Sequence, residues 1–342
     1  MLLEMVETEK AVGTALAHDV TRIVPGTSKG VGFKKGHIVT EADVPELLKL
    51  GKRHLYVLNL NGSHIHEDEA ALRMASAVAG TGLDMKGPDE GKVALLAREA
   101  GLARIDAEAL LEANMLGEMV ISTLKDGFPV KKGQQIAAMR VIPLVIETHK
   151  IVELEKLAQR TGPFIHLLPY RKPKVGGIAT GTEVYEGLIQ CGFDKHVAPK
   201  FDEFGLEFAG KVNVPDDPER IAGAILDFKA QGCGLVVTTG GLSVDPDDVT
   251  REGIRKSGAE IIAYGSPVLP GAMFCLAKLD DMIILGCPAC VYYHAATILD
   301  VMLPRILAGE VPTKRDIAAL GHGGLCMNCK VCRYPVCPFG CP

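Results

Sequence analysis

Residues 235–250 join a buried apolar run to a glycine-rich turn and a group of carboxylates, reading LVVTTGGLSVDPDDVT. Parallel α/β sheets build ligand sites at such junctions, where the carboxyl end of a strand meets the amino end of a helix. Gly240 and Gly241 allow the backbone to approach a ligand closely because they lack a Cβ. Ser243 and free backbone N–H groups can hold phosphate oxygens, and Asp248 can bind a metal or a polar ring edge. An ordinary strand–turn–helix connection with an aspartate N-cap is the alternative interpretation.

The sequence around this junction alternates apolar runs with amphipathic stretches. Ile221, Ala224, Ile225 and Phe228 recur at helical spacing and form one apolar face. Such alternation implies a mostly parallel sheet with helices on both sides, so we predict a three-layer α/β domain. The expected strands are 175–179, 211–214, 235–237, 261–263, 275–277 and 282–285, and the expected helices include 195–209 and 288–307.

The first part of the chain has shorter apolar runs and more turns. FKKGHIV at 33–39 and VKKGQQIA at 130–137 each place a Lys-Lys-Gly turn before alternating apolar residues, which favours β-hairpins or a barrel edge. Helices are expected over 40–50, 147–162 and, with a turn near Gly101, over 90–114, and strands are expected over 117–145. We predict an α+β domain with β-clip-like or barrel-like parts over 1–146, the α/β domain over 147–310 and a cysteine-rich tail over 311–342.

Residues 63–72, SHIHEDEAAL, gather two histidines and three carboxylates. Metal ligation is one interpretation, since these are ligand types. We favour the other, in which Ser63 or His66 begins a helix and the acidic first turn complements the helix dipole.

Four landmarks over residues 174–307 resemble, in the same order, the molybdopterin-binding domain of molybdenum cofactor biosynthesis proteins. TTGGLSVDPDDVT is similar to the TGG-S-x-G-x-x-D signature of that family, and GIATGTEV at 177–184 is similar to its strand ending in T-G-D-E. PGAM at 270–273 resembles its P-G-K-P segment, and GCPAC at 286–290 stands where the family has L-P-G-N-P. Two positions depart from the pattern, because Thr182 replaces the aspartate of T-G-D-E and Asp245 replaces a glycine of the main signature.

The resemblance implies a molybdopterin site at the carboxyl edge of the sheet, formed by the loops 180–183, 238–248 and 286–290. It implies Asp248 and Glu183 as catalytic carboxylates that orient the metal or an adenylate leaving group, with Mg²⁺ as a further candidate ligand. The implied cofactor-binding residues are Thr180, Gly181, Thr182, Thr239, Gly240, Gly241, Ser243 and Pro288.

Cys287 and Cys290 form a C-x-x-C pair at the expected amino end of a helix. That position lowers thiol pKa values, so thiolates that react or contact molybdenum are one interpretation. Two small buried side chains are the other.

The remaining cysteines gather in the segment 325–342, LCMNCKVCRYPVCPFGCP, apart from three in the body of the chain. In a cytosolic chain, clustered cysteines indicate metal rather than disulfides. The spacing C-x2-C-x2-C-x4-C-P can supply four thiolates to zinc or to a 4Fe-4S cluster, and we favour iron–sulfur. Free thiols in a disordered tail are the alternative. The predicted metal ligands are Cys326, Cys329, Cys332 and Cys337, with Cys341 as a fifth cysteine.

The composition argues for some classes of protein and against others. A chain of 342 residues with 47% hydrophobic content can bury a sizeable core, and its length suggests about two domains. A net charge of −5 without Lys/Arg runs argues against nucleic-acid binding. No apolar run approaches the roughly 20 residues of a membrane span, and the acidic start MLLEMVETEK is unlike a signal peptide. We therefore expect a soluble cytoplasmic protein.

Two functional hypotheses follow. AVGTALAHDVTRIVPG at 11–26 resembles the opening of molybdopterin molybdotransferases, but the P-x-x-x-x-S-x-M-D-G-Y-A segment of that family is absent. The first hypothesis is molybdopterin binding in molybdenum cofactor biosynthesis, with a molybdotransferase-like enzyme inserting metal from molybdate into adenylated molybdopterin. The alternative is a non-catalytic carrier or redox sensor that docks a molybdoenzyme through its cysteine cluster. The resemblance implies a homo-oligomer in either case.

Overall fold

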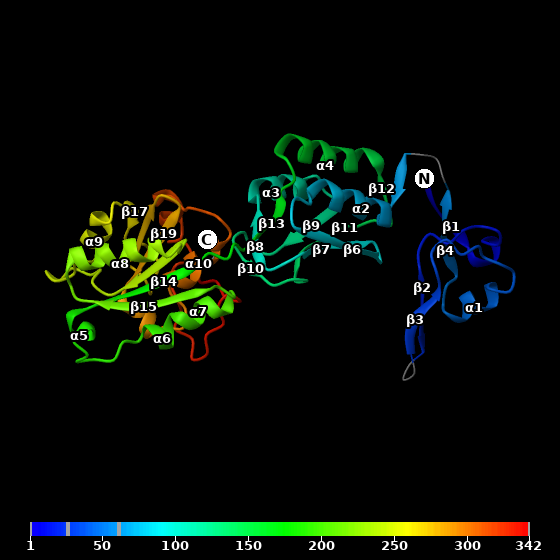
Figure 1. Ribbon diagram of the computed structural model, residues 1–342. Coiled ribbons are helices and arrows are strands. Elements are labelled where there is room, and N and C mark those ends of the chain that lie inside the picture. The colour runs from blue at the N-terminus through cyan, green and yellow to red at the C-terminus, as the bar shows by residue number, and fades with distance from the viewer. Residues whose placement is uncertain (1, 25–27, 60–62, 341–342) are drawn as a thin grey trace. The chain divides into compact units, whose positions relative to one another are not determined.

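The structure is a computed structural model that describes residues 2–24, 28–59 and 63–340 (Figure 1). The chain divides into two compact units. Unit one comprises Met1–Glu99, Ala103–Asp126 and Val130–Leu167, and unit two comprises Ala100–Leu102, Gly127–Pro129 and Leu168–Pro342. Within the described ranges, no helix combines the length and the apolar content that crossing a membrane requires.

The first sixty residues of unit one form two antiparallel strand pairs around a small core. β1 pairs with β4 and β2 pairs with β3, and the side chains of Leu16, Leu47 and Leu55 are buried between them. The predicted helix over 40–50 is present in shorter form as α1. The elements are β1 (Leu2–Glu7), η1 (Thr8–Lys10), β2 (Val20–Val24), β3 (Ser28–Phe33), α1 (Val44–Lys49) and β4 (His54–Asn59).

The rest of unit one is built on a four-stranded antiparallel sheet in the order β6-β7-β11-β9. Helix α2 lies over β7 and β11, and α4 packs on α2 (Figure 1). The elements are β5 (His64–His66), α2 (Glu67–Val78), β6 (Leu83–Asp89), β7 (Lys92–Ala97), β8 (Gly101–Ile105), α3 (Ala107–Met115), β9 (Met119–Thr123), β10 (Pro129–Val130), β11 (Gln135–Val141), β12 (Val145–Glu147), α4 (Thr148–Thr161) and β13 (Ile165–Pro169).

Two predictions for this region are wrong in part. Residues predicted as helix over 90–114 include the strands β7 and β8, and only α3 is helical. Alanine and leucine favour helix, but β7 lies between β6 and β11 with Val93 and Leu95 fully buried, so packing overrides intrinsic preference. Both Lys-Lys-Gly turns exist, with Gly36 and Gly133 at φ of 78° and 77°, but β10 pairs with β8 instead of forming a hairpin with β11.

Unit two contains a six-stranded sheet in the order β15-β14-β16-β19-β18-β17. The first four strands are parallel to one another, and β18 runs antiparallel to β19 and β17. The predicted, mostly parallel sheet is therefore confirmed. The strands are β14 (Val175–Thr180), β15 (Phe208–Val214), β16 (Leu235–Thr239), β17 (Glu260–Tyr264), β18 (Cys275–Leu279) and β19 (Met282–Cys287).

Helices cover both faces of this sheet and enclose two cores (Figure 1). Leu235 and Val237 of β16 face one core and Val236 faces the other, as the two-residue period of a strand requires. The predicted apolar stripe of α8 is buried on the Val236 face, which confirms the three-layer α/β prediction. The helices are α5 (Thr182–Tyr185), α6 (Phe193–His196), α7 (Ala198–Glu203), α8 (Pro218–Ala230), α9 (Thr250–Lys256), η2 (Ala289–Tyr292), α10 (Ile298–Leu307) and α11 (Lys314–Ala319).

Two predicted helices of unit two are shorter than expected. The helix predicted over 195–209 consists of α6 and α7 and ends at Glu203. Gly205, whose φ is 61°, lies between this end and the start of β15. The helix predicted over 288–307 starts only at Ile298. There Thr297 and Asp300 form a capping box, in which each side chain accepts a hydrogen bond from the helix start.

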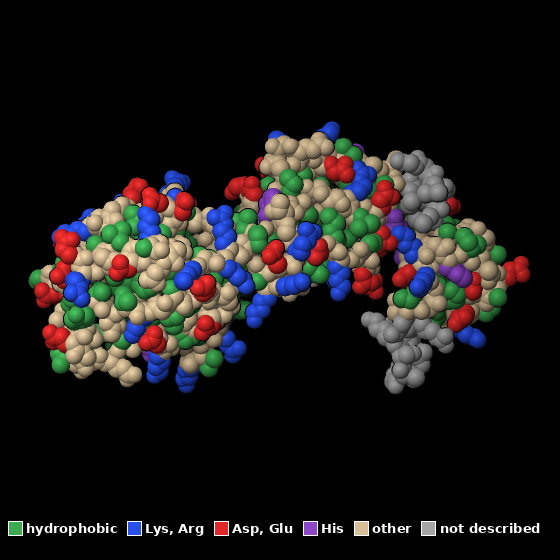
Figure 2. Space-filling view, in the orientation of Figure 1, with side chains coloured by type: hydrophobic (Ala, Val, Ile, Leu, Met, Phe, Trp, Pro, Cys, Tyr) green, Lys and Arg blue, Asp and Glu red, His purple; other side chains and the backbone are tan. Residues whose placement is uncertain are grey.

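Charged side chains of both signs are spread over unit two. On the face shown in Figure 2, basic and acidic side chains of the described residues are interspersed. Ion pairs form within unit two, as between Lys256 and Glu219 at 2.8 Å and between Lys211 and Asp194 at 3.1 Å. On this face the described residues thus form no broad basic stripe of the kind that tracks a phosphate backbone.

Candidate functional site

Three neighbouring parallel strands of unit two end at the same level. The register pairs Ala179 of β14 with Thr239 of β16, and Thr239 with Cys287 of β19. The loops that follow begin at Gly181, Gly240 and Pro288, so the three predicted loops leave one edge of the sheet. The structure thus brings together the strand ends from which the predicted site was built.

The turn after β16 requires glycine at two consecutive positions. Gly240 and Gly241 have φ angles of 89° and 59°, a region that residues with a Cβ disfavour. A Cβ on Gly240 would lie 2.5 Å from the Thr180 carbonyl oxygen, and a Cβ on Gly241 would collide with the Thr250 hydroxyl. The turn therefore packs tightly between the end of β14 and the start of α9.

Two buried threonine hydroxyls hold this turn. Oγ1 of Thr180 lies 3.1 Å from the Thr239 carbonyl oxygen and 3.0 Å from Oγ1 of Thr250, and the Thr250 hydroxyl donates to the Gly240 carbonyl oxygen at 3.0 Å. The two hydroxyl groups have two protons for these three contacts, so one of the protons is shared between two acceptor oxygens. Thr250 is fully buried and Thr180 is only 6% exposed, so water does not compete for these bonds.

Two carboxylates lie at the loop after β14, and one of them, Asp216, comes from the loop after β15. Thr182 donates from its backbone N–H and its hydroxyl to Oδ2 of Asp216, at 2.8 and 3.0 Å. The next residue, Asp217, is the N-cap of α8 and accepts two backbone N–H groups. Glu183 is exposed in the first turn of α5. A carboxylate therefore lies beside Thr182, although the aspartate of the T-G-D-E pattern is missing.

The loop after the glycine turn is closed by Asp248. Its Oδ2 accepts from the Asp245 backbone N–H at 3.0 Å, and its own N–H donates to the Asp245 carbonyl oxygen at 3.0 Å. One carboxylate oxygen of Asp248 thus shapes the loop itself. Ser243, earlier in the same loop, is exposed to solvent.

The third loop differs from the prediction. Cys287 ends β19 fully buried, and burial raises the pKa of its thiol far above the ordinary value. Burial also raises the pKa of the Cys290 thiol. Both pKa directions argue against free thiolates here, and the four-residue helix η2 that follows supplies no long helix dipole. Cys287 is instead a small buried side chain, the alternative given above. Pro288, at the start of the loop, is partly buried.

Three further residues lie at this edge and were not predicted there, namely Thr250, Asp216 and Tyr292. The hydroxyl of Tyr292 lies 2.6 Å from Oγ1 of Thr239, and burial raises the pKa of the phenol, so it stays protonated. Thr250 could have been suspected as the residue that ends the signature and begins a helix. Asp216 and Tyr292 carried no local signal of this role.

The predicted metal ligands of the tail do not surround a single ion. Among the described residues, no three His, Cys, Asp or Glu side chains are grouped closely enough to hold one metal ion. Cys326, Cys329, Cys332 and Cys337 are free thiols that line one cavity of about 460 Å³. Metal binding by these residues stays a prediction, and Cys341 lies outside the described residues.

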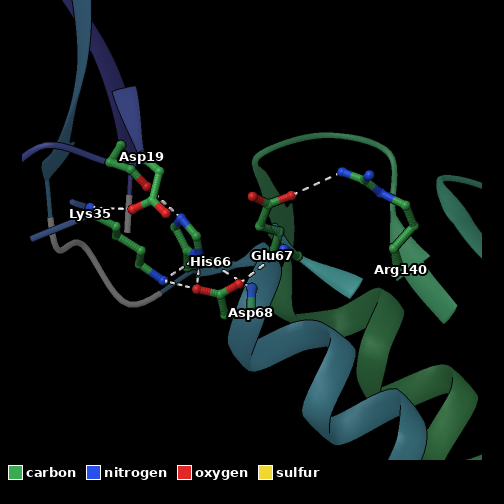
Figure 3. A network of polar contacts seen from close by, with 8 residues as sticks. Asp19, Lys35, His66, Glu67, Asp68 and Arg140 are labelled. Atoms are coloured by element: carbon green, nitrogen blue, oxygen red, sulfur yellow. Dashed lines mark hydrogen bonds and ion pairs between the residues drawn. The ribbon is translucent and has the colours of Figure 1, made fainter. Parts of the chain in front are cut away.

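The histidine and carboxylate cluster of unit one begins a helix, as favoured above. Nδ1 of His66 accepts from the Asp68 backbone N–H at 3.2 Å and lies 2.6 Å from Nζ of Lys35 (Figure 3). Nε2 lies 2.5 Å from the Ala17 carbonyl oxygen and must donate to it, so the ring is neutral. Burial lowers the pKa of His66 in agreement with this tautomer. His66 therefore caps α2 and joins it to the first sixty residues.

Comparison with known families identifies the central part of the chain. Residues 176–308 match a family described as a probable molybdopterin binding domain, and residues 5–59 match a domain of unknown function, DUF8806. The match contains all three loops of the candidate site. The predicted molybdopterin-binding domain of molybdenum cofactor biosynthesis is thereby confirmed for this part of the chain.

Curated relatives are similar over less than half of the chain. A molybdopterin molybdenumtransferase of Synechococcus elongatus is 26% identical over 156 residues, which cover 43% of this chain and 39% of the relative. A CinA-like protein of Amoebophilus asiaticus is 28% identical over 134 residues, which cover 39% and 30%. The chain thus spans well under half the length of these relatives.

Solved structures are similar over a comparable share of the chain. A CinA protein of unknown function from Thermoplasma acidophilum has 18% identity and a TM-score of 0.35, covering 40% of this chain and 98% of its own. The molybdopterin biosynthesis enzyme MoaB of Thermus thermophilus has 20% identity and a TM-score of 0.33, covering 42% and 99%. The assignment of the fold rests on the order and direction of the six strands.

Proposed function

We propose that the chain binds molybdopterin at the carboxyl edge of β14, β16 and β19 and acts in molybdenum cofactor biosynthesis. The glycine turn at Gly240 and Gly241 carries this proposal, because two buried threonines hold it at the level where three parallel strands end. A turn without side chains lets a phosphorylated ligand approach backbone N–H groups directly. The family match over 176–308 supports the same ligand.

In this proposal the phosphate of the pterin binds the backbone N–H groups of the turn and the hydroxyl of Ser243. Helix dipoles contribute little, because α5 has four residues and α9 has seven. The binding energy would come instead from oriented loop amides. Loops that start at Gly181 and Pro288 would flank the ligand on either side.

The carboxylates at the edge suit the metal-insertion step of a molybdotransferase-like enzyme, with molybdate as substrate. Asp248 has one carboxylate oxygen committed to the loop and a second that can orient Mg²⁺ or an adenylate leaving group. We infer that Asp216, held by Thr182, supplies the carboxylate that the T-G-D-E pattern provides elsewhere, beside Glu183. Attack of water on the phosphoanhydride would release AMP and leave the pterin phosphate, while the two dithiolene sulfurs bind the metal and their protons leave with oxygen of molybdate as water.

A non-catalytic carrier or redox sensor is the second candidate, and Thr182 at the position of an aspartate favours it. The two candidates differ in one product, because only the transferase releases AMP from adenylated molybdopterin and molybdate. Asp248→Asn keeps an oxygen acceptor for the Asp245 backbone N–H and removes the charge, so it should abolish AMP release without unfolding the loop. A recipient molybdoenzyme, a homo-oligomer and a cytoplasmic location stay predictions.

Pterin binding is tested on the full chain purified without oxygen, by the fluorescence of the pterin after oxidation. We expect stoichiometric pterin in the wild type and in Asp247→Asn, because Asp247 is exposed and is not among the predicted binding residues. Ser243→Ala should weaken binding about fivefold, because one hydrogen bond of about 1 kcal/mol is lost. Gly240→Ala should lose the pterin, because its Cβ meets the Thr180 carbonyl. A wild type that takes up no pterin after incubation with molybdopterin would sink the proposal.

A further inference from the structure

The four cysteines Cys326, Cys329, Cys332 and Cys337 line a single cavity of about 460 Å³ in unit two. Residues 293–296, which lie between η2 and α10, line the same cavity. None of the four thiols is part of a disulfide. Four free thiols around one cavity are a donor set for a thiophilic metal group.

The segment that presents these thiols is anchored to the domain. The Cys326 backbone N–H donates to the Leu269 carbonyl oxygen at 2.8 Å, and the Tyr334 hydroxyl donates to the Asp300 carbonyl oxygen at 2.9 Å. Phe339 is only 3% exposed and packs in the core beside α10. The disordered tail considered as an alternative is therefore wrong for residues 325–340, and the cysteines are held near fixed positions.

The two metal groups require different spacings of the thiols. A tetrahedral zinc ion binds sulfur at about 2.3 Å, which requires the sulfurs to lie roughly 3.8 Å apart. Among the described residues, no three metal-ligand side chains are gathered closely enough for one ion. A four-iron cluster holds its thiolates further apart, because each binds a different iron atom. A cavity of about 460 Å³ that is lined by four thiols leaves room for such a cluster.

The rest of the lining suits a cluster as well. Four thiolates leave an iron–sulfur cluster with net negative charge, and Lys330 and Arg333 line the same cavity and can offset it. Tyr334 and Phe339 contribute apolar surface, which limits access of water. We propose that this cavity binds a four-iron, four-sulfide cluster through Cys326, Cys329, Cys332 and Cys337. Each thiol releases its proton as its sulfur binds iron.

One loop connects this cavity with the candidate pterin site. Tyr292 bonds to Thr239 at the edge of the sheet, and the next residue, Tyr293, already lines the cysteine cavity. The cluster would therefore lie one short loop away from the ends of the strands. This position goes beyond the proposed pterin binding, and the cluster can be tested without any pterin.

The test is reconstitution of the full chain with ferrous iron and sulfide under anaerobic conditions, followed by desalting. We expect about four iron and four sulfide per chain, with broad visible absorption and an electron paramagnetic resonance signal after reduction with dithionite. Cys329→Ser and Cys332→Ser should each lose most of the iron and change the signal. Both residues are exposed, so circular dichroism should show that the variants remain folded.

Cys191→Ser is the matched control, because Cys191 is a partly exposed free cysteine outside the segment. It should retain the full iron and sulfide content. A single zinc ion per chain that excludes iron would overturn the proposal. So would wild-type protein that retains no iron after desalting, or a folded Cys329→Ser variant with an unchanged cluster.

Discussion

Replacing Thr250 with valine tests whether buried hydroxyls hold the glycine turn. Valine keeps the branched shape but lacks the hydroxyl, so the Gly240 carbonyl loses its 3.0 Å donor. The Thr180 hydroxyl still donates to the Thr239 carbonyl oxygen at 3.1 Å, so losing its contact with residue 250 costs little free energy. A carbonyl left without a partner costs about 1–3 kcal/mol. We expect the free energy of loop opening to fall by about 2 kcal/mol, which speeds amide exchange about 30-fold.

The measurement is hydrogen–deuterium exchange on peptides that cover residues 240–250, read by mass spectrometry. Thr238→Val, on the strand β16 that precedes the turn, is the matched control. The Thr238 hydroxyl is buried, and none of the described residues forms a hydrogen bond with it. The same substitution there should leave exchange unchanged or slower, since a buried unpaired polar group is removed. The reasoning would be refuted if amides of residues 240–250 exchanged at the wild-type rate in Thr250→Val. It would also be refuted if Thr238→Val accelerated their exchange as much as Thr250→Val does.

Three further outcomes are expected. Tyr292→Phe removes the 2.6 Å bond to Thr239 and should lower the free energy of unfolding by about 1 kcal/mol in urea, whereas an unchanged midpoint would contradict a structural role for the hydroxyl. Hydrogen bonds from a neighbouring imidazole and threonine lower the pKa of Asp43 to about 2, so the ionised carboxylate stabilises the fold above its ordinary pKa of 3.8 and this stabilisation is lost as pH falls towards 2. In urea titrations between these pH values, Asp43→Asn should therefore make the free energy of unfolding depend less on pH. A pH dependence equal to that of the wild type would contradict this role of Asp43. Cys287 should resist iodoacetamide in the native, metal-free protein while Cys329 is alkylated, as peptide mass spectrometry can show; rapid native labelling of Cys287 would be inconsistent with its burial.

The sheet of unit two could be predicted because its strands are buried on both faces. Strands of this kind read as continuous apolar runs, as in LVV at 235–237 and MIIL at 282–285. The turn at Gly240 was visible for a similar reason, since consecutive glycines after such a run indicate a backbone that leaves the sheet sharply. The local amino-acid composition was therefore sufficient to predict the strands that are buried on both faces.

The polar contacts of the site could not be predicted in the same way. Asp216 meets Thr182 across 34 positions of the chain, and Tyr292 meets Thr239 across 53. These contacts depend on which strands are neighbours and in which register, and no local pattern encodes either. The misassigned stretch at 92–97 has the same cause, because its partners β6 and β11 decide its conformation.

The anchored cysteine segment sets the boundary at which the α/β domain can be produced on its own. The matched family ends at residue 308, but residues beyond it cover part of the core, with Phe339 packed near Val301 and Leu325 bridged to Leu269. A recombinant fragment cut at residue 308 would expose this apolar surface to solvent and should aggregate. A fragment over 168–340 keeps these contacts, and crystallisation or labelling of the pterin edge should start from it.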